Sequence, residues 1–324
     1  MKERRWMAMG VALACSVLFL TGTAMAAERK FPTKPIQVII PFAPGETDSI
    51  LRPFAEKLPE YLGQPVNFVY KPGATGTVGA AFVAASKPDG YTLVGTSQSS
   101  VVINPLTQKD AGYTWESFAP VGAVAEGTLL FSVQSNARWK TIRDLVAEAK
   151  NNPGKISYAT PGVYNIMHLA AEAFLKQAGI KMNHIPAQGS GPVVTALLGG
   201  HVDIAGSGLS PALPHIKAGT MRALAIFKEK RNPSLPGVPT FKEMGYPVVV
   251  PTTVGFLAPK GTPPEVIEIY HSALKKVVEN HQAFLADRVD KIGAIVDFMG
   301  PAEHQAFLKS QYIFFSGLLK ELKP

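Results

Sequence analysis

The sequence predicts an α/β protein of two lobes that face each other across a cleft. Two stretches follow one plan of strand, Gly/Pro/Ser-rich loop, helix, strand, helix and strand, over residues 35–97 and again over 155–207. With 324 residues the chain is longer than a common single domain, so two cores are expected. Ligands of open α/β sheets bind outside the carboxyl ends of the strands, where these loops lie.

In the first unit, the apolar run 35–42 predicts a strand buried on both faces of a parallel sheet. Apolar residues with helical spacing follow it and end at Gly63. Pro53 lacks the amide hydrogen that a helix interior needs, so the regular helix is expected to begin only near Leu51 or Arg52. The other expected elements are a strand at 66–70, a helix at 77–85 and a strand at 91–95.

The second unit repeats this order. Apolar side chains between residues 166 and 174 fall on one stripe of a helix, which predicts its buried face. The expected elements are a strand at 156–159, a helix at 165–177, a strand at 183–186, a helix at 192–198 and strands at 202–205 and 222–227.

Two extended segments, residues 121–133 and 248–258, suit crossings between the lobes and therefore a hinge. Further helices are expected at 141–150, 264–280 and 301–322. The expected domains are residues 27–127 with 254–324 for lobe 1 and residues 128–253 for lobe 2.

The amino terminus has the pattern of a secretory signal peptide over residues 1–26. A basic stretch at 2–5 precedes an apolar run at 11–20, and the triplet Ala-Met-Ala occupies positions 24–26. The run is too short to favour a retained membrane anchor. We therefore expect cleavage before Ala27 and export to the periplasm.

Composition narrows the kinds of site. Cys15 is the only cysteine and lies in the apolar run of the leader, so the mature protein would have no disulfide, thiolate nucleophile or cysteine-ligated metal. Its position within the run does not favour a lipoprotein. Without the charged residues of the leader, the count falls from 32 basic and 24 acidic residues to 29 and 23, and the resulting net charge of +6 favours small anionic ligands. No run of Lys and Arg alternates with aromatic residues, so nucleic acid is not an expected partner.

The loop after the first strand is a candidate anion site. Gly45 lets the backbone approach a ligand closely, and amides at the start of the next helix can hold an anion without a charged side chain. Asp48 is expected first as the N-cap of that helix and second as a ligand contact. The predicted ligand-binding residues of this loop are Ala43, Pro44, Gly45, Glu46, Thr47 and Asp48.

The corresponding loop of the second unit also opens a helix, with Asn165 as its expected N-cap. Two facing loops of this kind would grip the two ends of a dicarboxylate. Tyr164 is interpreted either as a wall of the pocket or as loop packing, and His168 as structural or at the rim. The predicted ligand-binding residues of this loop are Pro161, Gly162, Val163, Tyr164 and Asn165.

Polar loops at 95–100, 187–191 and 206–210 add hydroxyls, an amide and flexible backbone at other strand ends. A plain turn is an equally good interpretation for any single serine among them, and a poorer one for the set. The residues that we select from these loops are Ser97, Gln98, Gln188 and Ser207.

A series of short motifs follows a fixed order along almost the whole mature chain. They include Pro41-Phe42 with Pro44-Gly45 and Thr47-Asp48, Pro88-Asp89-Gly90-Tyr91-Thr92-Leu93, Leu197-Leu198-Gly199-Gly200, Arg222-Ala223-Leu224-Ala225 and Gly261-Thr262-Pro263-Pro264. In these motifs the chain resembles the substrate-binding subunits of tripartite tricarboxylate transporters, the Bug-type extracytoplasmic receptors. The resemblance implies a type II periplasmic-binding-protein fold, two open α/β lobes joined by two crossing strands. It also implies carboxylate ligands held by loop backbone and ordered water, and integral-membrane transporter subunits as partners.

Some positions depart from the family pattern. Family members typically have two glycines in the first loop, whereas Glu46 follows Gly45 here and the loop is one residue shorter. A carboxylate facing the pocket would repel an anion by about 1 kcal/mol or more at about 4 Å. Either Glu46 points outward or the ligand carries a positive or hydrogen-bond-donating group. Ala187-Gln188 replaces a Tyr-Lys pair and Ser207 replaces an Asp, which enlarges the pocket and alters its charge.

The main prediction is a monomeric periplasmic receptor that delivers a di- or tricarboxylate or an aromatic carboxylate to a membrane transporter. An exported enzyme on the same fold and a ligand sensor for a signalling protein are the alternatives. The sequence lacks a Gly-x-Ser-x-Gly elbow, a dinucleotide fingerprint and a phosphate loop, and its 7 histidines do not have metal-ligand spacing. We therefore expect no catalytic residue, no metal and no cofactor.

Overall fold

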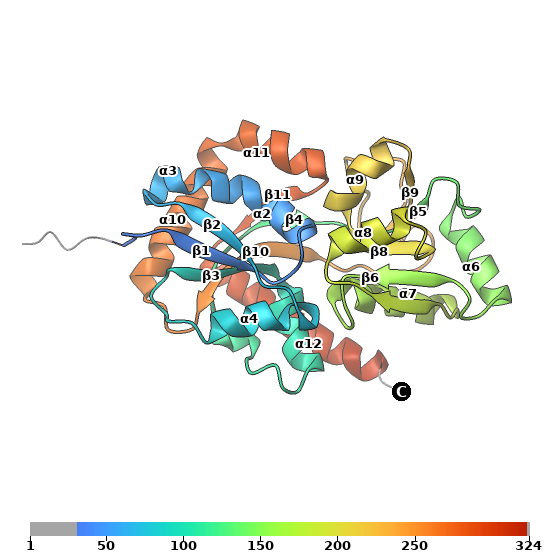
Figure 1. Ribbon diagram of the computed structural model, residues 1–324, viewed down its shortest axis with the longest axis horizontal. Coiled ribbons are helices and arrows are strands. Elements are labelled where there is room, and N and C mark those ends of the chain that lie inside the picture. The colour runs from blue at the N-terminus through green and yellow to red at the C-terminus, as the bar shows by residue number, and fades with distance from the viewer. Residues whose placement is uncertain (1–30, 323–324) are drawn as a thin grey trace, which may run out of the picture. The chain divides into compact units, whose positions relative to one another are not determined.

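The strands assemble into two separate sheets with helices packed around them (Figure 1). The computed structural model describes residues 31–322, so the expected signal peptide at 1–26 lies outside the described residues. From Lys34 onward the chain forms one compact unit. We call the part built on the six-stranded sheet lobe 1 and the part built on the five-stranded sheet lobe 2. This two-lobed α/β architecture confirms the predicted fold class.

The sheet of lobe 1 is mixed. Its strands are β1 (Ile36–Ile40), β2 (Val66–Tyr70), β3 (Thr92–Ser97), β4 (Phe118–Gly127), β10 (Thr252–Pro259) and β11 (Ile295–Met299). They lie in the order β11-β4-β10-β3-β1-β2. Strand β1 pairs in parallel with β2 and β3, whereas β10 runs antiparallel to β3 and β4. The carboxyl ends of β1 and β3 therefore lie at the same edge of the sheet.

The sheet of lobe 2 repeats this plan with fewer strands. They are β5 (Leu129–Gln134), β6 (Ser157–Thr160), β7 (Asn183–Pro186), β8 (Ile204–Gly208) and β9 (Met221–Ile226). Their order is β7-β6-β8-β5-β9, with β6 parallel to β7 and β8, and β5 antiparallel to β8 and β9.

The chain passes between the lobes twice, where the sequence predicts it. Strand β4 ends at Gly127 and β5 begins at Leu129 in the other sheet. On the return, the Val250 amide still bonds to Phe227 of lobe 2 at 3.0 Å, and β10 of lobe 1 begins at Thr252. The domain limits at 127/128 and 253/254 stay a prediction.

Helices cover both sheets. In lobe 1 they are α2 (Glu46–Lys57), α3 (Pro59–Leu62), α4 (Thr77–Ala84), α5 (Asn104–Thr107), α10 (Pro264–Asn280), α11 (Gln282–Val289) and α12 (Pro301–Leu322). In lobe 2 they are α6 (Ile142–Asn151), α7 (Ile166–Ala178), α8 (Ser190–Leu198) and α9 (Leu209–Lys217). In Figure 1, α2 and α11 lie above the first sheet with α4 and α12 below it, and α8 and α9 lie above the second with α7 below. None of the helices of residues 31–322 is long and apolar enough to cross a membrane.

The predicted start of the first helix near Leu51 or Arg52 is wrong. Helix α2 begins at Glu46 and keeps Pro53 in its interior. Its inner face buries Ile50, Leu51 and Phe54 completely. Burial of three such side chains contributes roughly 1.5–3 kcal/mol each, which outweighs the cost of about 3 kcal/mol for an internal proline. The open loop is therefore shorter than expected.

Two of the expected polar loops belong to regular structure. Strand β3 extends to Ser97, and β8 extends to Gly208 with α9 beginning at the next residue. Glycines occur there because helices pack closely on the strands: a Cβ at Gly95 would lie 2.7 Å from Leu51, and one at Gly206 would lie 3.0 Å from Met167. Sequence reasoning took these small residues for turns.

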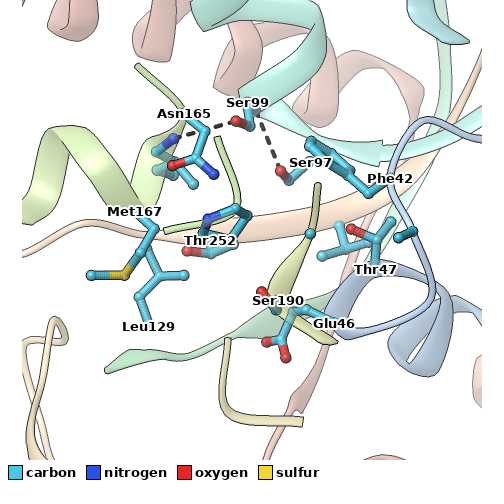
Figure 2. Close-up of a pocket in the computed structure, with 15 residues that line it drawn as sticks. Phe42, Glu46, Thr47, Ser97, Ser99, Leu129, Asn165, Met167, Ser190 and Thr252 are labelled. Carbon is cyan, nitrogen blue, oxygen red and sulfur yellow. Dashed lines mark hydrogen bonds between the residues drawn. The ribbon is translucent and has the colours of Figure 1, made fainter. Parts of the chain in front are cut away.

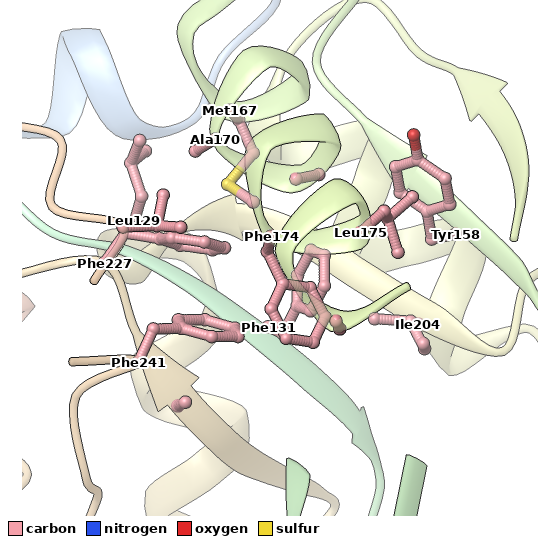
Figure 3. Close-up of a cluster of buried hydrophobic side chains, with 14 of the residues drawn as sticks. Leu129, Phe131, Tyr158, Met167, Ala170, Phe174, Leu175, Ile204, Phe227 and Phe241 are labelled. Carbon is pink, nitrogen blue, oxygen red and sulfur yellow. The ribbon is translucent and has the colours of Figure 1, made fainter. Parts of the chain in front are cut away.

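The core of lobe 2 forms around Phe131, which packs edge-on against three other aromatic rings (Figure 3). The centroids of Phe174, Phe227 and Phe241 lie 5.9, 5.5 and 5.7 Å from that of Phe131. This geometry suits the ring quadrupoles. Leu129 and Met167 belong to the same cluster and also reach the space between the lobes.

Candidate functional site

A cavity of about 50 Å³ lies between the lobes, where strand ends of both sheets meet (Figure 2). At roughly 10–15 Å³ for each water, it holds only a few water molecules. Its walls combine the start of α2 and the end of β3 from lobe 1 with the starts of α7 and α8 from lobe 2. The lining residues are Phe42, Ala43, Glu46, Thr47, Ser97, Ser99, Leu129, Pro161, Asn165, Ile166, Met167, Gly189, Ser190, Thr252 and Val254.

Three helices begin at this cavity: α2 at Glu46, α7 at Ile166 and α8 at Ser190. The first amides of a helix lack intrahelical partners, and the dipole places partial positive charge at the N-terminus. No lysine or arginine lines the cavity in the described part of the chain. The cavity can therefore attract an anion through backbone alone.

Hydroxyl groups complete the polar part of the wall. The Ser99 Oγ accepts the Ile166 amide at 3.3 Å, a bond that joins lobe 1 to the first residue of α7. The Ser190 Oγ accepts the Gly208 amide at 3.1 Å. These hydroxyls can each donate a proton to a bound anion while they accept a backbone amide.

Glu46 does not point outward, and that alternative is wrong. Its side chain is 9 % exposed and reaches lobe 2, where its Oε2 accepts the Ser210 amide at 2.7 Å. Its Oε1 is buried without a hydrogen-bond partner. Burial raises the pKa of the Glu46 carboxyl to about 7, against the opposing effect of hydrogen bonds from Ser210 and Thr128. The wall of the cavity thus holds one acidic side chain.

Asp48 is not the N-cap of α2. Gly45 is the N-cap, and the Asp48 Oδ1 accepts the Gly45 amide at 2.6 Å from the first turn. The other carboxylate oxygen binds Arg52 at 3.3 Å and the Tyr70 hydroxyl at 2.9 Å. The Gly45 amide is thereby already occupied by a carboxylate of its own helix.

The second loop confirms the predicted cap. The Asn165 Oδ1 accepts the His168 amide at 2.8 Å at the start of α7. Tyr164 adopts a left-handed conformation with φ 57° and is 47 % exposed. Its amide donates to the Nδ1 of His168 at 2.9 Å, so His168 is a buried support of this loop. Thr75 of lobe 1 donates to the Val163 carbonyl at 3.4 Å.

His168 stacks on His184 with ring centroids 3.9 Å apart. Burial and, to a smaller extent, the neighbouring His168 lower the pKa of His184 to about 4. The Glu172 carboxylate accepts from the Tyr158 hydroxyl at 2.5 Å and lies 3.6 Å from His168. Within residues 31–322, no group of three His, Cys, Asp or Glu side chains is placed to hold a metal ion.

The structure brings the two predicted loops to one cavity but not all of their residues. Those that line it are Ala43, Glu46, Thr47, Ser97, Pro161 and Asn165. The predicted residues that lie outside its lining are Pro44, Gly45, Asp48, Gln98, Gly162, Val163, Tyr164, Gln188 and Ser207.

Several of the residues outside the lining have other partners. Gln98 is 1 % exposed and donates to the Pro251 carbonyl at the second crossing at 2.6 Å. Ser207 is fully buried and donates to the Gly208 carbonyl. The Gln188 carbonyl accepts the Ala43 amide at 2.9 Å, which links the lobes through backbone.

Sequence reasoning missed nine of the fifteen residues that line the cavity. Ser99, Gly189 and Ser190 lie in loops whose polar character was recognised, but they were not selected. Ile166 and Met167 follow the predicted cap and could have been found, because the first turn of α7 had to face the loop. The remaining missed residues are Phe42, Leu129, Thr252 and Val254.

The fold and the cavity together are those of a two-lobed binding protein. Residues 50–296 match the family described as the tripartite tricarboxylate transporter family receptor, TctC. The chain belongs to this family, as its short motifs predict. Members of the family are solute-binding receptors.

Individual relatives agree with this assignment. The chain is 33% identical to Protein BugT of Bordetella pertussis (strain Tohama I) over 298 residues, or 90% of each chain. The solved structure of the periplasmic binding protein BugD is similar with a TM-score of 0.83 at 30% identity, covering 90% of this chain and 98% of that one. R. palustris Rpa4515, solved with adipate, has a TM-score of 0.85 at 26% identity and the same coverage.

Proposed function

We propose that this protein is a periplasmic receptor that captures a small organic acid between its lobes and delivers it to a membrane transporter. The observation that supports this best is the start of α7 and α8 at a cavity whose lining has no basic side chain. Family membership supports a role in transport, and the relative solved with adipate supports a carboxylate ligand.

In this proposal the ligand carboxylate lies at the N-terminus of α7, away from the Glu46 carboxyl group. Backbone amides of the first turn of α7 and the hydroxyls of Ser97, Ser99 and Thr252 hold it. Pro161 and Asn165 close the cavity from lobe 2, and Ala43 and Thr47 close it from lobe 1. The small volume means that the lobes part to admit the acid.

The proposal includes export by a cleaved signal peptide, a monomeric receptor and a binding function without catalysis. The Ser99 and Ser190 hydroxyls and the Glu46 Oε2 accept backbone amides, and no hydrogen bond in the described lining pairs a hydroxyl nucleophile with a base.

Isothermal titration calorimetry on the chain from Ala27 onward tests the proposal. A panel of mono-, di- and tricarboxylates and aromatic acids is titrated, with the corresponding amides as neutral controls. We expect saturable binding of at least one acid and none of its amide. Absence of binding across the panel, or turnover of a bound acid, would reject the receptor function.

A further inference from the structure

Glu46 caps a helix of the opposite lobe. Helix α9 begins after Gly208, which has no side chain to act as a cap. The Leu209 amide bonds to the Thr128 carbonyl at 2.8 Å, and the Ser210 amide bonds to the Glu46 Oε2 at 2.7 Å. A carboxylate at this position satisfies an orphan amide and interacts favourably with the helix dipole.

Two glycines make the room for this carboxyl group. A Cβ at Gly208 would lie 2.3 Å from the carboxyl carbon of Glu46, and a Cβ at Gly127 would lie 2.8 Å from its Oε1. Gly208 ends β8 and Gly127 ends β4, so both strand ends are shaped around Glu46. The carboxyl group therefore lies in a tightly packed space between Gly127 and Gly208, which we call the Glu46 socket.

The two sides of the cavity consequently differ in charge. On one side, the starts of α2 and α9 already hold an acidic side chain of the protein itself. On the other side, α7 starts at Asn165 and Ser99, where the lining has no acidic side chain (Figure 2). Between them the wall is partly apolar, with Phe42, Leu129 and Val254.

We propose that Glu46 restricts the ligand to monocarboxylic acids with an apolar body, because its carboxylate holds the place that the second carboxylate of a diacid would take. This inference rests on the proposed function and narrows its ligand class. One carboxylate binds at the start of α7, and the apolar part of the acid extends toward Phe42 and Leu129. A second carboxylate would face Glu46, and the lining offers no basic side chain between them.

Matched pairs of acids test the inference, because the two members differ only in the second carboxylate. Butanoate and succinate, hexanoate and adipate, and benzoate and terephthalate are titrated by calorimetry at alkaline pH. The wild-type chain is expected to prefer the monoacid by roughly tenfold or more in the pair that binds best, since like charges repel in a desolvated site. The variants Glu46→Gln and Glu46→Ala are expected to lose most of that preference.

Glu56→Gln is the control, since Glu56 is exposed on the same helix and its removal changes the net charge equally. It should retain the preference. The inference is overturned if the wild-type chain binds a diacid as tightly as its monoacid, a result that needs no variant. It is also overturned if both Glu46 variants fold and keep the wild-type preference. Failure of every acid to bind would instead reject the proposed function, and this inference with it.

Discussion

The raised pKa of the Glu46 carboxyl group predicts how the free energy of unfolding depends on pH. Burial raises its pKa from 4.5 to about 7, and the nearby Asp48 contributes a smaller rise. A raised pKa gives stability that is fully present below the unfolded value and is lost as the pH rises through the folded value. The loss therefore falls between about pH 4.5 and about pH 7 and amounts to roughly 3 kcal/mol.

Glu46→Gln removes this titration, so its free energy of unfolding should fall less than that of the wild type across the same pH range. Denaturant unfolding at several pH values measures the difference, and Glu56→Gln should follow the wild type. Parallel curves for the wild type and Glu46→Gln would show that the carboxyl group does not titrate in this range.

Residues with local partners could be predicted from the sequence, and those with distant partners could not. The Asn165 cap was predicted because its partner His168 is three residues away. The partner of Glu46 is 164 residues away in the other lobe, and the sequence does not indicate it. The sequence indicated only that the Glu46 carboxylate would repel an anionic ligand if it faced the pocket. For Asp48 the capping preference was recognised, but its position in the first turn was not.

At the scale of elements, the N-cap of helix α7 can be tested for two separate effects, one on the stability of the fold and one on the binding of an acid at the cavity. Asn165→Ala loses the 2.8 Å bond to the His168 amide, and we expect a loss of about 1 kcal/mol in the free energy of unfolding. Asn165→Asp keeps an acceptor oxygen and therefore most of the stability. It should nevertheless weaken binding of an acid, because it adds negative charge to the cavity wall.

Denaturant unfolding and calorimetry measure the two effects separately. Thr141→Ala is the control, since Thr141 caps α6 by accepting the Asp144 amide at 3.2 Å and does not line the cavity. It should lose stability without losing affinity. Equal affinity of Asn165→Asp and the wild type would contradict the placement of the anion at α7.

The end of β8 offers a steric test of the Glu46 socket. Gly208 has φ −69°, which any residue adopts, so Gly208→Ala acts only through its contact with Glu46. We expect the single variant to be destabilised and the double variant with Glu46→Ala to recover part of the loss. A coupling of about 1–3 kcal/mol in a double-mutant cycle would agree with a shared contact. Additive effects would show that the two residues do not depend on each other.

Elements with a clear apolar stripe were predicted almost to the residue. The helices at 264–280 and 301–322 have the expected limits. Helix α9 was missed because Pro211 and Pro214 interrupt its pattern, although its first turn is anchored by Glu46 and Thr128. The short elements α11 and β11 were missed as well. In these cases tertiary contacts decide the structure, and propensity does not.

At the scale of the whole molecule, the described state is one in which the lobes touch. The Ala43 amide bonds to the Gln188 carbonyl, and Ile166 bonds to Ser99. Helix α12 also joins the lobes, since its Phe315 is part of the lobe 2 core. The repeated units predicted two lobes and a cleft. They could not predict this closed contact, because it depends on loop conformations that no local pattern encodes.

The contact between loop Pro44-Gly45 and the start of α8 leaves no space for a side chain. A Cβ at Gly191 would lie 2.3 Å from the Pro44 carbonyl oxygen, and a Cβ at Gly45 would lie 2.8 Å from the Gly191 amide nitrogen. Gly191→Ala and Gly45→Ala change different lobes but obstruct the same contact. Both should therefore shift the protein toward an open form with weaker binding of the acid, by about tenfold for each 1.4 kcal/mol of lost closure.

Small-angle scattering and calorimetry together test this expectation. Each variant should have a larger radius of gyration than the wild type in the presence of the acid, with unchanged far-UV circular dichroism. Because one substitution alone could strain its own loop, the two variants, one in each lobe, must have the same effect. Only then is lost closure supported as the cause of the weaker binding. Gly237→Ala is the control, since a Cβ there meets no atom within 4 Å. Wild-type affinity and dimensions in both variants would mean that the acid binds without this contact between the lobes.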